Sequence, residues 1–353
     1  MKRKLLAMFS LALLMAMGCT HLTPEQQREK AADLYQQADT MLSAFNPGAQ
    51  HAVAQYETAV DYLKESDALG YEPAAWRLAG VYRSSYAMKN LGNSRDENLA
   101  QYRLYLNKAA SAGISDAQAE LADNYAHGDM GYPEDHARAI ALWEQAAESG
   151  NRQAMRELVA YYYYKTCDGC QEKYVYWMEQ WSEGANAYDQ AKLGIRFENG
   201  DGFPQDYGKA AYWYQKAADQ GSELGYHYLG HLYLYGKGVS QDFAKAGQLM
   251  TEAADRETWG GASHHLGEIY YYGLGVKTNY QEAFKHYMQG AEEGYYGSMY
   301  MVAYMYQKGQ GVKADRKLAR EWYEKGKARE YNDGYNDDKY LAPALKALNR
   351  AFK

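Results

Sequence analysis

The sequence predicts an all-α protein, a solenoid of stacked helix hairpins, and three observations lead to that prediction. A motif recurs along the chain with a period of about 36 residues. Within each copy, apolar residues recur three and four apart, which places them on one face of a helix. Glycine-rich turns followed by Asp or Asn separate the two halves of each copy. One hairpin cannot bury both of its faces, so successive hairpins are expected to stack.

Two helices are expected before the repeats, over residues 24–72. The segment from Thr23 to Gln26 is a capping-box start for a helix that runs to Asn46-Pro47-Gly48. A partner helix follows to Gly70. This pair is predicted to cap the N-terminal end of the solenoid.

The repeats are predicted over residues 74–330, as about seven units. The clearest copies run from Leu229 to Asp242 and from Leu266 to Asn279, each with a Gly-x-Gly-Val segment between a Tyr and the final Asp or Asn. Glycine takes positive φ without strain and can end the first helix, and the Asp or Asn can then cap the second. Other copies begin at Leu121, Leu158, Leu193 and Val302, with a degenerate one at Leu78, and the expected caps are Asp206, Asp242, Asn279 and Asp315.

The last predicted element is a C-terminal capping helix within residues 331–353. Leu341, Leu345 and Leu348 are spaced to form one apolar face, and basic residues occupy the final turn.

This repeat resembles the Sel1-like repeat, a relative of the tetratricopeptide repeat, over about residues 74–330. The resemblance implies a right-handed α-solenoid that holds other proteins in a concave groove and is not an enzyme. By the same resemblance, such proteins assist envelope machines, polysaccharide export or signalling. Some are immunity lipoproteins that neutralise secreted phospholipase effectors, and some cysteine-rich relatives are described as β-lactamases.

Residues 1–18 have the features of a secretory signal peptide. Three basic residues precede an apolar stretch from Leu5 to Met17, which is too short for a permanent membrane span. Ala16-Met17-Gly18-Cys19 resembles the lipobox of bacterial lipoproteins, which implies a lipid on Cys19 and a tether over residues 19–23. A cleaved, soluble periplasmic protein is the alternative. Thr20, where the resemblance places the sorting residue, favours the outer membrane, with the protein facing the periplasm.

Charge and composition narrow the classes of molecule that the protein is expected to bind. The formal charge of -7 becomes -10 once the signal peptide is removed, and an acidic surface argues against nucleic acid as a partner. Tyrosine stands out, with 38 residues against 7 Phe and 7 Trp, and its ring and hydroxyl together suit half-wet repeat cores and binding grooves.

Cys167 and Cys170 stand where other copies have the glycine turn. In an oxidising compartment they are expected to form one structural disulfide, and a redox-active pair is the alternative. A zinc site would need a second cysteine pair, and Gln171 stands where haem attachment needs histidine.

The groove positions of the tetratricopeptide unit, transferred by the resemblance, predict the partner-binding residues. His227 and His231 lie two residues before and two residues after Leu229 in one copy. His264 and Glu268 lie in the same positions around Leu266 in the next copy. Each pair shares a helix face, so the four could converge on zinc or form a hydrogen-bonded polar patch. The rest of the predicted groove is Arg156, Tyr163, Glu198, Tyr271, Tyr300 and Tyr304.

No catalytic motif stands out after the signal peptide. There is no Ser-x-x-Lys, and no Gly-Lys-Ser or Gly-Lys-Thr follows the Gly-x-Gly turns, so neither a penicillin-binding serine nor a phosphate loop is predicted. We therefore expect no catalytic residue and no cofactor. The sequence favours a membrane-anchored scaffold of the bacterial cell envelope that binds a partner protein, with the immunity lipoprotein and a weak β-lactam hydrolase as alternatives.

Overall fold

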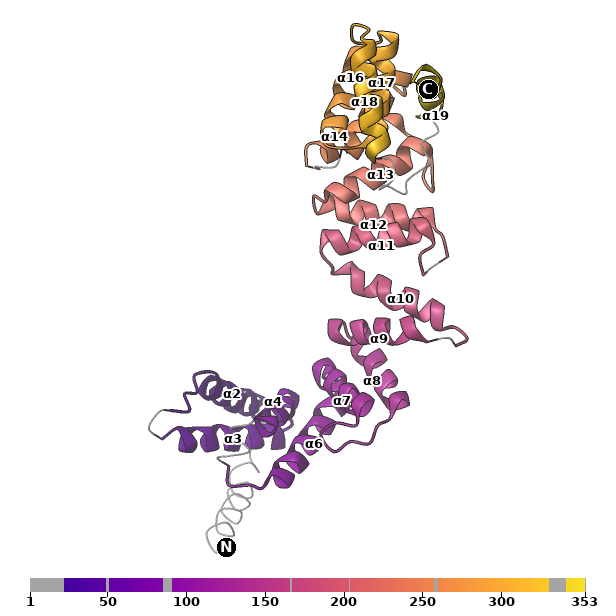
Figure 1. Ribbon diagram of the computed structural model, residues 1–353. Coiled ribbons are helices and arrows are strands. Elements are labelled where there is room, and N and C mark those ends of the chain that lie inside the picture. The colour runs from indigo at the N-terminus through magenta and orange to yellow at the C-terminus, as the bar shows by residue number, and fades with distance from the viewer. Residues whose placement is uncertain are drawn as a thin grey trace, which may run out of the picture. The chain divides into compact units, whose positions relative to one another are not determined.

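The computed structural model describes residues 22–48, 51–84, 91–165, 167–202, 204–256, 260–329 and 341–352. All regular elements within these ranges are α-helices (Figure 1). The chain divides into two compact units, Met1–Met178 and Glu179–Lys353. We call them unit 1 and unit 2.

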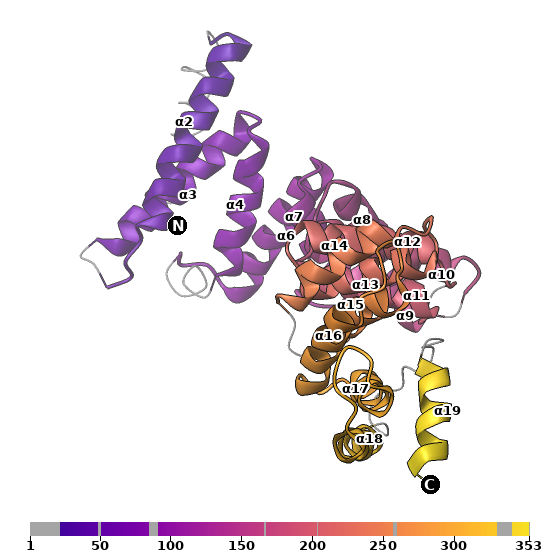
Figure 2. The same cartoon turned by 90° about the horizontal axis from the view of Figure 1, so that it is seen from above.

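Unit 1 is built from antiparallel helix pairs. The two helices expected before the repeats, α2 and α3, pack along each other (Figure 2). Further pairs are α4 with α6 and α7 with α8. The helices are α2 (Pro24–Ser43), α3 (Ala52–Ala68), α4 (Glu72–Arg83), α6 (Arg95–Ser111), α7 (Ser115–His127), α8 (His136–Glu148), α9 (Arg152–Tyr164) and α10 (Cys170–Glu183), and the division between the units falls within α10.

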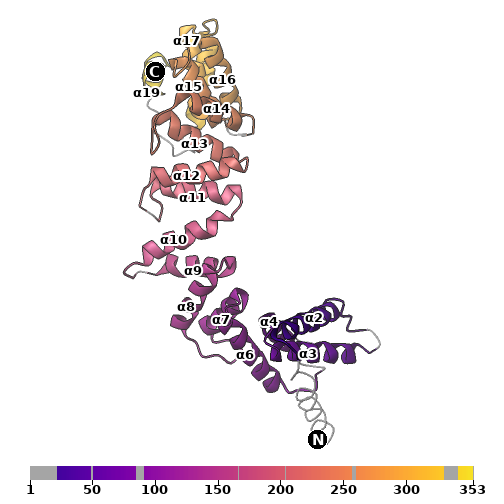
Figure 3. The same ribbon diagram turned by 180° about the vertical axis from the view of Figure 1, so that it is seen from behind.

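Over its described residues, unit 2 contains four hairpins and a last single helix (Figure 3). Each hairpin packs on the next, and the first helices of neighbouring hairpins also meet, since α13 contacts both α11 and α15. The helices are α11 (Ala187–Asn199), α12 (Tyr207–Asp219), α13 (Glu223–Tyr235), α14 (Phe243–Ala254), α15 (Gly261–Tyr272), α16 (Tyr280–Glu292), α17 (Tyr296–Lys308), α18 (Arg316–Arg329) and α19 (Leu341–Phe352).

The predicted helix ends are confirmed in unit 2. Gly236 closes α13 at φ 68°, and Asp242 then accepts a hydrogen bond from the Lys245 backbone N–H at 3.0 Å to begin α14. Asp206, Asn279 and Asp315 cap α12, α16 and α18 in the same way. The capping box of Thr23 and Gln26 at the start of α2 is also present. These local signals therefore determine where the hairpins turn.

The second glycine of the turn serves the stacking of hairpins. A side chain on Gly238 would collide with the backbone of Tyr207, at the start of the second helix of the preceding hairpin. Gly275 meets Phe243 and Gly311 meets Tyr280 in equivalent positions. Each turn thus packs closely on the hairpin before it, which only glycine permits.

Small residues also let the two helices of a hairpin approach closely. A Cβ on Gly267 of α15 would lie 2.5 Å from the Tyr287 ring of α16, and Tyr287 is itself fully buried. Contacts this close raise packing density in a core that otherwise consists largely of alanine, tyrosine and methionine.

The C-terminal helix α19 packs on α17 (Figures 2 and 3). Leu341, Leu348 and Phe352 are buried there in one cluster with Tyr323 of α18. The predicted amphipathic helix is confirmed over Leu341–Phe352, and its apolar face covers the end of the repeat core.

The predicted signal peptide, Cys19 and the first residues of the tether lie outside the described residues, as do residues 330–340 before α19. Among the described residues, none of the helices has the length and apolar character needed to span a membrane.

Candidate functional site

The predicted groove residues divide into an exposed and a buried group. Arg156 and Tyr163 lie seven residues apart on one face of α9, and both are exposed, Tyr163 by 55%. Arg156 pairs with the adjacent Glu157 at 2.8 Å. Tyr271 and Tyr304 are half-buried. All four side chains are therefore at least partly exposed, and their role in binding a partner stays a prediction.

The remaining six groove positions are buried, which corrects the prediction of an open wall. Their exposed fractions are at most 5%, because neighbouring helices pack directly over them. The residues are Glu198, His227, His231, His264, Glu268 and Tyr300.

Four of these buried residues, together with His265, form what we call the histidine cluster of unit 2. His227 and His231 lie on α13, and His264, His265 and Glu268 lie on α15. The His265 ring lies 5.6 Å from the His227 ring, 5.4 Å from the His231 ring and 5.6 Å from the His264 ring, measured between centroids.

Hydrogen bonds tie the histidine cluster together. His265 donates from Nδ1 to Glu268 Oε2 at 2.8 Å, and the Tyr235 hydroxyl donates to the same oxygen at 3.1 Å. On the side of α11, Glu198 accepts from the Tyr214 hydroxyl at 2.7 Å and lies 3.9 Å from His231 Nδ1. Polar side chains thus link the first helices of successive hairpins, where the prediction placed a groove.

His264 connects the histidine cluster to α17. Its Nδ1 is hydrogen-bonded to Ser298 Oγ at 3.0 Å, and a Cβ on Gly297 would lie 3.2 Å from its Cε1. Small residues on α17 therefore let that helix close over the imidazole. Tyr300, one turn further along α17, packs against Tyr323 of α18 and belongs to the hairpin core.

Burial controls the protonation of His227 in the histidine cluster. Desolvation, and then the neighbouring imidazoles of His265, His231 and His264, lower the pKa of His227 well below 6.5. A charged His227 would have no water around it and other imidazoles beside it. Near neutral pH it is uncharged in the folded protein.

The structure does not arrange His227, His231, His264 and Glu268 as a zinc site. The four residues do lie together, but Glu268 accepts from His265 and Tyr235, and His264 is bonded to Ser298. No group of three or more His, Cys, Asp and Glu side chains in the described parts of the chain is arranged to hold a metal ion. The alternative, a hydrogen-bonded polar patch, is the arrangement present.

Half-exposed tyrosines form a second feature of unit 2, which we call the aromatic patch: Tyr271, Tyr272, Tyr280 and Tyr304. The Tyr271 ring lies 4.8 Å from that of Tyr272 and 5.1 Å from that of Tyr280. The Tyr271 hydroxyl donates to Gln310 at 2.9 Å, and burial, with Tyr304 and Tyr280 nearby, raises its pKa to about 12. These rings are held in place while part of their surface stays accessible.

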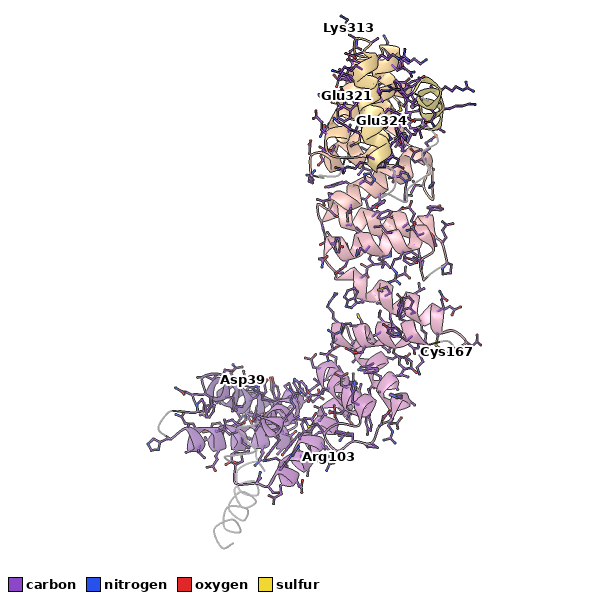
Figure 4. All side chains as sticks on the ribbon, viewed as in Figure 1. Asp39, Arg103, Cys167, Lys313, Glu321 and Glu324 are labelled. Carbon is purple, nitrogen blue, oxygen red and sulfur yellow. A yellow bond between two sulfur atoms is a disulfide. The ribbon has the colours of Figure 1, made fainter. Side chains whose placement is uncertain are left out.

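The cysteine pair forms the predicted disulfide. Cys167 and Cys170 are bonded in the turn between α9 and α10, and Cys167 lies at the surface (Figure 4). Their Cα atoms are 5.2 Å apart. The bond replaces the glycine turn of the other hairpins as the local closure.

A comparison with models of protein families identifies the repeat to which these hairpins correspond. The Sel1 repeat model matches residues 115–151, 187–222, 224–257, 261–295 and 297–330. The chain belongs to the Sel1 repeat family. Sel1 repeat proteins are protein-interaction scaffolds, so the surfaces of this Sel1 repeat protein are where a partner is to be sought.

The solved structures that are similar to this Sel1 repeat protein include the following three. A protective antigen of uropathogenic Escherichia coli with an SLR fold is 26% identical, covering 94% of this chain and 68% of its own, with a TM-score of 0.47. A Sel1 repeat protein from Oxalobacter formigenes is 22% identical over 96% and 93%, with a TM-score of 0.43. An immunity protein from Pseudomonas aeruginosa is 18% identical over 74% and 83%, with a TM-score of 0.29. No curated protein matches the chain.

Several residues of these sites were not predicted from the sequence. His265 belongs to the histidine cluster, Tyr235 is hydrogen-bonded to it, and Tyr272 and Tyr280 belong to the aromatic patch. The spacing of Tyr235, four residues after His231, was the available signal. Tyr280 carried none, because it lies in a different helix and meets Tyr271 only in the folded unit.

Proposed function

We propose that this Sel1 repeat protein is a membrane-anchored scaffold of the bacterial cell envelope that binds a partner protein through the aromatic patch. The family supports the scaffold role. The aromatic patch is the observation on which the choice of the partner-binding surface rests.

The anchor is proposed from the N-terminal sequence. A lipid on Cys19 would hold the protein at the outer membrane, facing the periplasm, since Thr20 follows the cysteine. The disulfide of Cys167 and Cys170 supports an oxidising compartment such as the periplasm.

The aromatic patch suits protein recognition for three reasons. Its rings combine apolar faces with hydroxyl groups, which is the chemistry of interface hot spots. Their mutual contacts and the bond from Tyr271 to Gln310 restrict them before a partner arrives, so little entropy is lost on binding. Lys308 Nζ lies 5.6 Å from the Tyr304 ring centroid and adds a cation at the edge.

The test is capture of partners from cross-linked cell envelopes. The variant Tyr271→Ala with Tyr304→Ala is expected to lose the partner that the unaltered protein recovers. The matched control is Tyr188→Ala with Tyr212→Ala, two tyrosines of unit 2 that are 54% and 48% exposed and lie outside the aromatic patch. Equal recovery by both variants, at unchanged melting temperature, would show that the aromatic patch is not the binding surface.

The identity of the captured protein distinguishes the two candidate roles. An envelope machine or export component supports a scaffold, whereas a secreted phospholipase would assign the role of an immunity lipoprotein. The anchor is tested separately by Cys19→Ser, which is expected to abolish labelling with a fatty acid and to release the protein from the membrane fraction.

A further inference from the structure

The charge of the chain is unevenly distributed. Between residues 308 and 329 there are eight Lys and Arg against three Asp and Glu, in a protein whose net charge is -7. Two more basic residues, Lys346 and Arg350, lie on α19. The last hairpin and its covering helix are therefore basic in an otherwise acidic protein.

These basic side chains are exposed to solvent and form few ion pairs within the protein. Among the described residues, the ion pair found for α18 is Lys317 with Glu321, at 3.9 Å. Asp315 is engaged as the cap of α18, where it accepts from the Lys317 and Leu318 backbone N–H groups. α18 carries most of the positive charge of the last hairpin, and the acidic residues of α18 do not neutralise it.

Aromatic rings support part of this charge. The Arg320 guanidinium lies 5.7 Å from the Phe352 ring centroid, and Lys327 Nζ lies 5.6 Å from that of Tyr323. The two rings are 5.4 Å apart, and the Tyr323 hydroxyl donates to Asn349 at 2.6 Å. Because Arg320 and Lys327 are seven residues apart on α18, they lie on the same side of the helix, the side that meets α19.

We call the row of Arg316, Arg320 and Lys327, which lies along one side of α18, the basic face. Arg316 stands four residues before Arg320, so it extends the row by one turn. All three residues are exposed.

We propose that the basic face binds an acidic segment of a partner protein. This inference rests on the proposed scaffold function and specifies the chemistry of the partner. Two of the three cations are guanidinium groups, whose planar donors match carboxylates in paired hydrogen bonds. The rings beside Arg320 and Lys327 limit the motion of these two side chains, so less entropy is lost when a carboxylate binds.

The acidic residues of α18 favour a protein over a continuous polyanion. Glu321 and Glu324 are exposed on the same helix (Figure 4). A membrane of anionic lipids or a nucleic acid backbone presents uniform negative charge, which these carboxylates would repel. A peptide can place its carboxylates against the basic face and leave other side chains opposite Glu321 and Glu324.

The test uses the full chain in detergent and a fluorescein-labelled octaglutamate peptide, followed by fluorescence anisotropy. Saturable binding at low salt that weakens with added salt is expected. The variant Arg316→Glu, Arg320→Glu and Lys327→Glu should weaken binding by about tenfold or more. The matched control, Lys192→Glu, Lys277→Glu and Lys285→Glu, changes three other exposed cations of unit 2 and the net charge equally, and should change binding by less than about threefold.

Three results would overturn the inference. One is no binding of octaglutamate at low salt, and another is equal loss in both triple variants, which would mean unspecific charge attraction. The third is tighter binding of phosphatidylglycerol vesicles or of a single-stranded oligonucleotide, lost in the Arg316, Arg320 and Lys327 variant. Unchanged circular dichroism ensures that the variants are folded. If octaglutamate fails to bind while envelope partners are still captured through the aromatic patch, this inference fails and the scaffold role stands.

Discussion

Two positions of the repeat have opposite surroundings in α9 of unit 1 and in helices of unit 2. Arg156 of unit 1 stands two residues before Leu158, and His264 and Tyr300 of unit 2 stand two residues before Leu266 and Val302. Arg156 is exposed, whereas His264 and Tyr300 are 0% and 1% exposed. The same holds five residues after the key Leu, where Tyr163 is 55% exposed and Glu198 is 5% exposed.

The difference comes from how closely successive helices approach. Around His264, the small residues Gly297 and Ser298 let α17 close over the imidazole and supply its hydrogen-bond partner. Around Glu268, Tyr235 arrives from α13. A repeat position therefore carries no fixed exposure, because the residues of the neighbouring repeats decide it.

The largest effect should come from removing the central carboxylate of the histidine cluster. Glu268→Ala leaves the buried His265 and the Tyr235 hydroxyl without their acceptor, which should lower the free energy of unfolding by about 3 kcal/mol. Urea unfolding followed by circular dichroism measures the change. A loss below about 1 kcal/mol would contradict the description of this cluster as a stabilising link between hairpins.

Acidification should lower the folding stability of unit 2, and the titration of His227 is the expected cause. Its pKa is lowered in the folded state, so below the ordinary value of 6.5 the unfolded chain binds more protons than the folded one. Stability should therefore fall as the pH drops through 6.5. Melting temperatures between pH 7.5 and pH 5 should fall less for His227→Phe than for the unaltered protein. Parallel pH profiles for the two proteins would exclude His227 as the cause.

The disulfide of unit 1 should contribute a smaller stabilisation. It closes only a short loop, and the chain-entropy model gives about 1–2 kcal/mol for a loop of this size. Cys167→Ala with Cys170→Ala should lower the free energy of unfolding by that amount. A reductant should shift the unaltered protein equally and leave the variant unchanged; a shift of both proteins would point to another cause.

The smallest effect is expected at the exposed positions of α9. Arg156→Ala and Tyr163→Ala should each change the free energy of unfolding by no more than about 0.5 kcal/mol, because solvent already surrounds both side chains. Thermal unfolding provides the measurement. A loss as large as that of Glu268→Ala would remove the contrast between the two regions.

Local structure was predictable from the sequence with good detail. The glycine turns, the caps at Asp206, Asp242, Asn279 and Asp315, and the capping box at Thr23 all act within a few residues, so their chemistry is readable along the chain. The disulfide of Cys167 and Cys170 was equally local.

The candidate site was predictable only in part. Helical spacing correctly brought His227, His231, His264 and Glu268 together, but it could not assign their partners. His265 and Ser298 occupy hydrogen-bonding atoms that the zinc hypothesis required. The aromatic patch joins three helices, so only part of it, Tyr271 and Tyr304, was visible in the repeat register.

The sequence by itself determined the all-α hairpin architecture, the phase of the repeat and the ends of its helices, because backbone φ preferences and caps operate over a single turn. Only the tertiary structure decided which wall positions are covered and which remain accessible. That outcome depends on the volume and polarity of side chains about one repeat away, such as Gly297 and Ser298 above His264, and no single repeat contains that information.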